Sequence, residues 1–205
     1  MEKENRLIRL FSFDESRFGL LTTKRRRITL SGIKPVGKMQ IEYKYYWLYG
    51  AFDILSGESF YWEYNKMTKL NFQHFITDLS KKYPDSLNII LMDNSKTHDT
   101  EIEFDNIKFI NTEPYSPELN PAERVWHFIK DKLNWETFES ISKLQDFVNQ
   151  HIKQITNKQI LSLTSFSYLI QACNALSIVV KGRSFKSAAV TFAIDPVTSR
   201  LFCVP

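Results

Sequence analysis

Three carboxylates in this sequence follow segments that would hold them rigidly. Asp14 follows the apolar run Leu7–Phe13, Asp93 follows the apolar run Leu87–Met92, and Glu123 opens a helix after a stretch with three prolines. Cleavage of a phosphodiester and transfer of a DNA strand can use two divalent cations about 3.5–4 Å apart. Carboxylate oxygens are the ligands that Mg²⁺ and Mn²⁺ prefer, and three carboxylates brought together would repel one another without cations. The pattern therefore predicts a two-metal site for phosphoryl transfer.

Each acid also has a purely structural interpretation. An aspartate at the end of a strand is commonly a turn or capping residue. The run Asn120-Pro121-Ala122-Glu123 is a good helix start that requires no catalysis. Glu15 competes with Asp14 for the first position. The joint pattern of three acids, rather than any one of them, favours the metal site.

The segments around these acids alternate between strands and helices. Strands are expected at 7–13, 26–33, 43–54, 59–64, 87–92 and 107–110, with a hairpin turn at 55–58. Helices are expected at 68–83, 121–133 and 140–155, and Leu144 and Val148 belong to an apolar stripe in the last. No glycine-rich phosphate loop is present. This order indicates an α/β fold with a mixed central sheet flanked by helices.

The composition of the 205-residue chain indicates one domain with a packed core. Hydrophobic residues make up 43% and aromatic residues 14%, which argues against global disorder. No run is long and apolar enough to span a membrane, and the charged N-terminus lacks an apolar signal region. Cys173 and Cys203 lack metal-ligand spacing. We therefore expect a reduced, cytoplasmic setting and no membrane partner.

Basic residues are concentrated in one short cluster. The formal net charge is +4, which is only a weak sign of an anionic partner. The cluster consists of Lys24, Arg25, Arg26 and Arg27. It is either a solvated turn or, because it lies near the predicted phosphodiester site, a DNA contact.

One stretch of the chain has the pattern of a known family. The segment Pro114–Trp126, together with Asp93-Asn94 and His98, resembles the catalytic half of bacterial insertion-sequence transposases related to the mariner superfamily. The run Phe13-Asp14-Glu15-Ser16 resembles their first acidic motif. The resemblance extends over roughly Leu7 to Leu163.

The resemblance implies a ribonuclease-H-like fold and a triad of two aspartates and a glutamate. In that triad, Asp14, Asp93 and Glu123 would bind two Mg²⁺ or Mn²⁺ ions. The residues that would position these groups are Asn94, His98 and Asn120. The implied activity is cleavage of double-stranded DNA at transposon ends, followed by attack of the freed 3′-hydroxyl on target DNA. Such a protein would act at the nucleoid, in the cytoplasm.

The chain departs from the family pattern in three places. Thirty positions separate Asp93 from Glu123, fewer than we expect of the family. No helix-turn-helix region for binding transposon ends precedes Asp14, which leaves room for a separate end-binding helix-turn-helix protein or reading frame, and for a homodimer. We expect residues 1–165 to form the catalytic domain. Residues 166–205 would be a C-terminal tail that does not match what we expect of the family. The sequence leaves three interpretations of this tail open: an extra hairpin, a disordered tail or a frameshifted end.

Two other functions stay open beside the transposase. The first is an inactive or repurposed transposase fragment that at most binds DNA. The second is a ribonuclease-H-like nuclease of another type. The proline-rich segment before Glu123 argues against the second.

Overall fold

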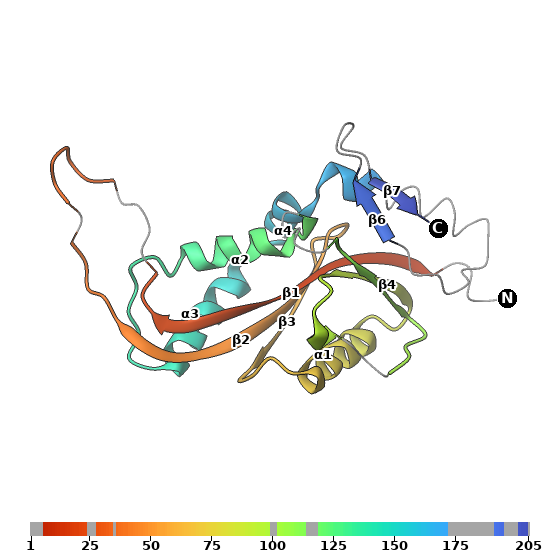
Figure 1. The fold of residues 1–205 in the computed structure, drawn as a ribbon, viewed down its shortest axis with the longest axis horizontal. Coiled ribbons are helices and arrows are strands. Elements are labelled where there is room, and N and C mark those ends of the chain that lie inside the picture. Colours follow the sequence, from red (N-terminus) through yellow and green to blue (C-terminus); the bar gives the residue numbers. More distant parts are fainter. Residues whose placement is uncertain are drawn as a thin grey trace.

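The fold is built on a mixed five-stranded sheet with β1 in its middle (Figure 1). The structure is a computed structural model that describes residues 6–23, 28–34, 36–98, 102–113 and 119–171, and the backbone of 191–194 and 201–204. The sheet order is β3-β2-β1-β4-β5. The strands are β1 (Leu7–Leu21), β2 (Ile41–Asp53), β3 (Ser59–Tyr64), β4 (Ser86–Met92) and β5 (Ile107–Asn111). The first three pair antiparallel, whereas β4 and β5 run parallel to β1. This confirms the expected mixed sheet.

β1 is longer than the sequence predicted. The expected strand ended at Phe13, but pairing with β2 continues past Asp14 as far as Leu21. Ser16, Phe18 and Leu20 are buried and continue the inward alternation. The prediction that Asp14 lies at the end of a strand is therefore wrong. The buried side chains of Ser16, Phe18 and Leu20 keep β1 in the sheet as far as Leu21.

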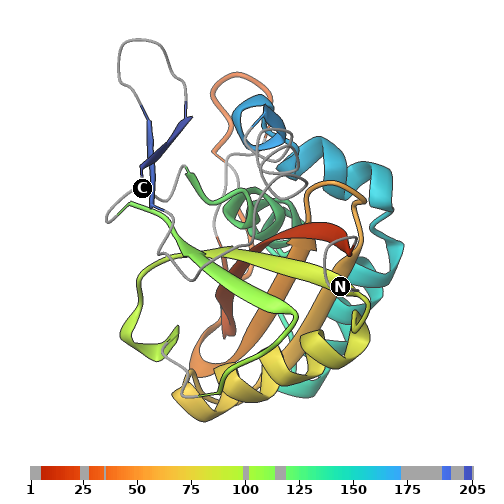
Figure 2. The ribbon, with the colours of Figure 1, turned by 90° about the vertical axis from the view of Figure 1, so that its right-hand side faces the viewer.

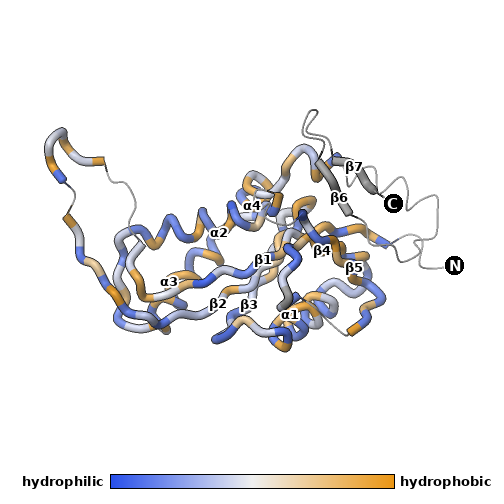
Figure 3. Tube along the Cα trace, in the orientation of Figure 1, coloured by the Kyte–Doolittle hydropathy of each residue, from blue (hydrophilic) through white to orange (hydrophobic). Residues whose placement is uncertain are grey.

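The expected strand at 26–33 is also not found in its described part. Residues 28–34 form no strand, and Gly32 has a φ of 82° within a turn, a conformation that glycine adopts without strain. The described residues of the connection between β1 and β2, 28–34 and 36–40, instead extend away from the body as an arm (Figure 1). Figure 3 shows apolar residues along this arm, and Ile28, Leu30 and Val36 are among its exposed ones.

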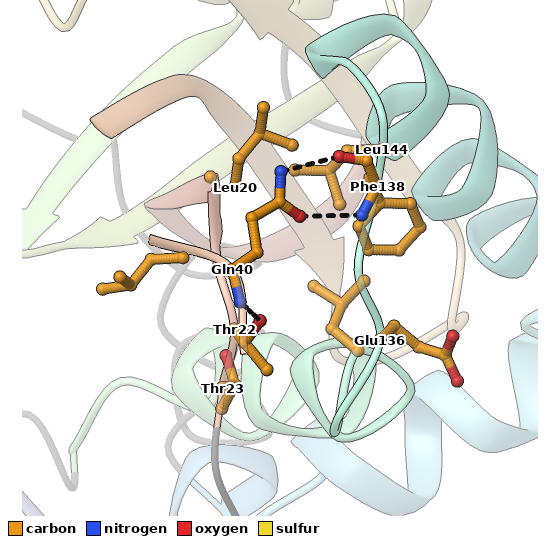
Figure 4. A pocket seen from close by; sticks show the side chains of 10 residues that line it. Leu20, Thr22, Thr23, Gln40, Glu136, Phe138 and Leu144 are labelled. Carbon is orange, nitrogen blue, oxygen red and sulfur yellow. Dashed lines mark hydrogen bonds between the residues drawn. The ribbon is translucent and has the colours of Figure 1, made fainter. Parts of the chain in front are cut away.

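The base of the arm is tied to the segment that follows α2 (Ala122–Asp131). Thr22 N donates to Gln40 O at 3.1 Å, and Gln40 N donates to Thr22 Oγ1 at 2.8 Å. The Gln40 side chain then donates to Phe138 O at 2.8 Å and accepts from Phe138 N at 2.9 Å (Figure 4). This amide side chain thus makes the two bonds that a neighbouring strand would make.

Helices cover both faces of the sheet. The helix α1 (Lys69–Lys82) packs on one face against a cluster that includes Phe11 and Phe13. The helices α2, α3 (Ile141–Gln154) and α4 (Asn157–Thr164) pack on the other face with Phe18 and Leu20. Figure 2 shows the yellow helix α1 below the strands and the blue helix α4 above them. None of the helices in the described segments is both long and apolar enough to cross a membrane.

Three helices begin at a capping side chain, of which the sequence predicted Thr68, whereas α4, capped by Thr156, was not predicted. Thr68, Ser140 and Thr156 have extended backbones, and each side chain accepts a hydrogen bond from a backbone N–H in the first turn. Each cap therefore satisfies one of the free donors that every helix start carries.

The residues after α4 continue to pack on the domain. Ser165 Oγ donates to Ile54 O at 2.8 Å, and Leu169 is buried in a cluster with Leu10 and Ile54. Farther along, β6 (Thr191–Ile194) and β7 (Leu201–Val204) pair as a two-stranded antiparallel sheet. The division of the chain at residue 165 stays a prediction.

Candidate active site

The alternation along β1 separates its two neighbouring acids. Leu10, Phe18 and Leu20, at even positions, pack in clusters on the side of α2 and α4. Phe11 and Phe13, at odd positions, pack on the side of α1. Because successive side chains of a strand point to opposite faces, Asp14 lies on the α2 face and Glu15 on the α1 face. Only Asp14 therefore shares a face with Glu123.

Asp93 follows directly after β4, the strand beside β1. The parallel pairing of β1 with β4 runs as far as Ser12 and Leu91. Asp14 and Asp93 each come two residues after this pair, Asp14 still within β1 and Asp93 just beyond the end of β4. The negative charge of Asp93 acts on Asp14, so the register brings the two aspartates near each other at the carboxyl end of β4.

Glu123 is carried to this region because the start of α2 is bonded to β1. Ser12 Oγ donates to Asn120 Oδ1, and Asn120 Nδ2 donates to Phe13 O at 2.9 Å. Ala122 N in turn donates to Ser12 Oγ at 2.8 Å and to Asn120 Oδ1 at 3.2 Å. The side chains of Ser12 and Asn120 are therefore buried but fully engaged. They fix the first turn of α2, and with it Glu123, beside Asp14.

Sequence reasoning missed Ser12, although the sequence contains a signal for it. Ser12 is the one polar residue in the run Leu10-Phe11-Ser12-Phe13, and it is fully buried. A buried hydroxyl needs a hydrogen-bond partner. The signal predicts a polar contact but does not reveal that the contact is with Asn120.

Asp14 lies in buried and acidic surroundings. Burial raises the pKa of its carboxyl group well above its ordinary value, and the negative charges of Glu123, Glu15 and Asp93 raise it further. The hydrogen bond from a backbone N–H lowers it only in part. A carboxyl surrounded in this way is unfavourable in its charged form unless a cation is near.

His98 lies between Asp93 and Glu15 at the end of the short helix η2 (Lys96–His98). Its Nδ1 is 2.8 Å from Asp93 Oδ1, and its Nε2 is 2.9 Å from both carboxylate oxygens of Glu15. Burial lowers the pKa of His98, but its bonds to Asp93 and Glu15 outweigh burial and raise the pKa to about 10. The pKa of Asp93 is lowered, chiefly by the bond to His98. His98 is thus a buried partner of two acids.

Of the remaining predicted site residues, the structure describes Asn94 alone. Asn94 is exposed and has no hydrogen-bond partner among the described residues. The basic cluster of residues 24–27 lies outside the described residues.

The acids fit divalent cations by their chemistry. Within the described residues, no group of three or more His, Cys, Asp and Glu side chains is placed so that it could hold a metal ion. However, burial and the negative charges of three nearby acids raise the pKa of Asp14, which a bound cation would offset. Carboxylate oxygens are donors that suit Mg²⁺ and Mn²⁺. Asp93 Oδ1 is occupied by His98 and by Ser95 N, whereas Oδ2 has no partner among the described residues. One oxygen of Asp93 is therefore available to an ion.

Solved structures with this fold are known. The chain is similar to the Mos1 transposase paired-end complex with left transposon end, with a TM-score of 0.64 at 15% identity over 86% of this chain and 56% of that chain. It is also similar to the Mos1 strand transfer complex, with a TM-score of 0.63 at 16% identity over 88% of this chain and 56% of that chain. A Mos1 mariner paired end complex with Mn gives 0.64 and 15%, over 87% and 57%.

These likenesses identify the architecture as the ribonuclease-H-like fold. The chain spans little more than half the length of the Mos1 chains that it matches. No curated protein has a significantly similar sequence. Residues 9–145, more than half of the chain, match the family described as DDE superfamily endonuclease. The fold, the grouped acids and this match agree, and the chain belongs to the DDE superfamily endonucleases.

Proposed function

We propose that this protein is the catalytic domain of a DNA transposase that cleaves DNA at transposon ends and joins the cut strand to target DNA. The metal ligands in this proposal are Asp14, Asp93 and Glu123. The observation that supports it is the acidic surroundings of Asp14: burial raises its pKa, and the negative charges of Glu123, from the first turn of α2, and of Asp93, after β4, raise it further.

The chain's own residues would divide the work as follows. Asp14 and Asp93 would hold two Mg²⁺ or Mn²⁺ ions between them, and Glu123 would complete one of the two sites. Bound divalent cations supply an activated attacking oxygen and stabilise the leaving oxygen. Ser12 and Asn120 keep Glu123 in place through the start of α2. No protein side chain is needed as a nucleophile, because water or a DNA 3′-hydroxyl attacks the phosphorus.

The partner in this proposal is double-stranded DNA, first as transposon ends and then as target. Lys24, Arg25, Arg26 and Arg27 would contact phosphates, which makes binding weaker at high salt. The Mos1 structures are paired-end and strand transfer complexes. By analogy, we propose that this chain works as a homodimer and that end recognition comes from a separate helix-turn-helix region.

A nicking assay tests the assignment. Purified protein is incubated with supercoiled plasmid in Mn²⁺ or in Mg²⁺. The parent chain is expected to nick the plasmid, whereas Asp93→Asn and Glu123→Gln are expected to remove the activity while leaving the fold intact, as circular dichroism would show. Asp146→Asn, an exposed acid on α3, is the matched control and should nick like the parent.

Undiminished nicking by either active-site variant would sink the ligand assignment. A parent chain that binds DNA but does not nick it in either metal would instead support a fragment that only binds DNA.

A further inference from the structure

We infer that Glu15 is a positioning residue that orients the metal ligand Asp93 through His98, beyond the carboxyl end of β4. The inference rests on the proposed function, because it takes Asp93 to be a metal ligand. It gives a role to the one acid of the group that the metal assignment does not use.

Glu15 is held in place by a geometry that suits an ion pair. Both of its carboxylate oxygens lie 2.9 Å from His98 Nε2, and the side chains of Glu15 and His98 are 5% and 3% exposed. The imidazole is fixed by aromatic neighbours, with ring centroids 5.4 Å from Phe13 and 5.0 Å from Phe72. A buried carboxylate that lost its partner would be left uncompensated.

His98 faces hydrogen-bond acceptors at both ring nitrogens. Nε2 faces the carboxylate of Glu15, while Nδ1 faces the carboxylate of Asp93 at 2.8 Å and the Asp93 carbonyl at 3.1 Å. Both ring nitrogens of His98 are thus engaged, one by each acid, and the imidazole connects Glu15 to Asp93 directly.

Asp93 depends on this bond for its orientation. Its side chain is 60% exposed, so packing alone does not fix the carboxylate. His98 Nδ1 and Ser95 N both take Oδ1, which turns Oδ2 outward with no partner among the described residues. Partners behind a metal ligand fix its orientation in this way, and their loss commonly weakens metal binding about 10–100-fold.

The position of Glu15 excludes it as a direct ligand in this arrangement. It lies on the α1 face of β1, opposite to Asp14 and Glu123, and both of its oxygens are engaged by His98. Its effect on the metal site therefore passes through His98 rather than through the ion.

The test measures Mn²⁺ affinity without DNA and, separately, nicking against Mn²⁺ concentration. Glu15→Gln keeps an acceptor for Nε2 but removes the charge. It is expected to raise the dissociation constant for Mn²⁺ about 10-fold and to approach the parent's maximal rate at high Mn²⁺. Glu63→Gln is the matched control, because Glu63 also accepts bonds from side chains, Gln145 and Asn149, but has no link to Asp93. It should leave the Mn²⁺ affinity unchanged.

A second variant shows whether the effect passes through His98. In a His98→Gln background, Glu15→Gln is expected to have little further effect on Mn²⁺ affinity, because the link is already cut. Parent-like Mn²⁺ affinity in Glu15→Gln, or full additivity of the two changes, would overturn the inference. If Glu15→Gln does not fold, His98→Gln alone decides, and parent-like Mn²⁺ affinity there would overturn it.

The same measurement separates this inference from the proposed function. Asp93→Asn is expected to lose Mn²⁺ binding outright. If Asp93→Asn binds Mn²⁺ like the parent, the ligand assignment itself fails. If Asp93→Asn loses binding and Glu15→Gln does not, only the role of Glu15 fails.

Discussion

Replacing Asp14 with Asn should stabilise the metal-free protein while removing its metal site. Burial raises the pKa of Asp14, and the negative charges of Glu123, Glu15 and Asp93 raise it further. The neutral amide of Asn has nearly the same shape but is not repelled by these acids. The substitution therefore relieves the folded state of a repulsion that the unfolded chain does not have.

The size of the gain follows from the raised pKa. At pH 7, each unit by which the folded state raises the pKa of Asp14 corresponds to about 1.4 kcal/mol of lost stability. For a protein of this length, 1 kcal/mol moves the melting temperature by roughly 2–4 °C. We therefore expect Asp14→Asn in a chelator to melt higher by roughly 3–6 °C for each such unit.

The pH dependence has a definite sign. An acid whose pKa is raised in the folded state gives the protein its full stability below the unfolded value of 3.8 and removes stability as pH rises toward the folded value. Parent and variant should therefore melt together near pH 3. The parent should fall behind at neutral pH.

The assay is thermal unfolding in EDTA and in excess Mn²⁺, with Asp146→Asn as the control for an exposed aspartate. Mn²⁺ at 100 times its dissociation constant should add about 2.7 kcal/mol to the parent and far less to Asp14→Asn, so the advantage of the variant in melting temperature should shrink. If Asp14→Asn melts below the parent in EDTA at pH 7 while Asp146→Asn does not, the electrostatic reasoning about Asp14 is wrong.

Three other predictions concern groups around the site. Ser12→Ala removes the shorter of the two hydrogen bonds from Ala122 N and the hydroxyl that donates to Asn120 Oδ1, both in a buried position, so chemical denaturation should give a loss of about 1–3 kcal/mol, and a loss below about 0.5 kcal/mol would contradict this. Leu169→Ala should cost about 2–5 kcal/mol, because Leu169 is buried against Leu10 and Ile54; a negligible cost would place the end of the domain before it. Because the pKa of His98 is raised to about 10, its contribution to stability should be complete below its unfolded value near 6.5 and lost as pH rises through about 10, and a stability difference between parent and His98→Gln that does not shrink over this range would speak against the raised pKa.

Much of the site could be predicted from local sequence. The apolar run before Asp93 and the prolines before Glu123 are local signals for a buried strand and a helix start, and both elements are present. The mixed order of the sheet also follows from the succession of strands and helices.

Other features depend on tertiary contacts that no local pattern contains. The end of β1 was misplaced because Arg17 and Gly19 interrupt the apolar run, although Phe18 and Leu20 still face inward. The choice between Asp14 and Glu15 required knowing which face α2 covers. The contacts of His98 join residues 83 positions apart in the chain, and such a distance leaves no periodic trace in the sequence.

The alternation of β1 has a consequence for how the gene can change in length. Deleting or inserting one residue between the Ser12 anchor and Asp14 would turn the following side chains to the other face and exchange the two acids' sides. A substitution there removes one side chain, whereas such an insertion or deletion would separate Asp14 from Glu123 and Glu15 from His98 at the same time. The register shift that the strand does carry lies between Gly19 and Leu21, beyond both acids, and the arm follows directly. Length variants among relatives should therefore accumulate in the arm and be excluded from the first half of β1.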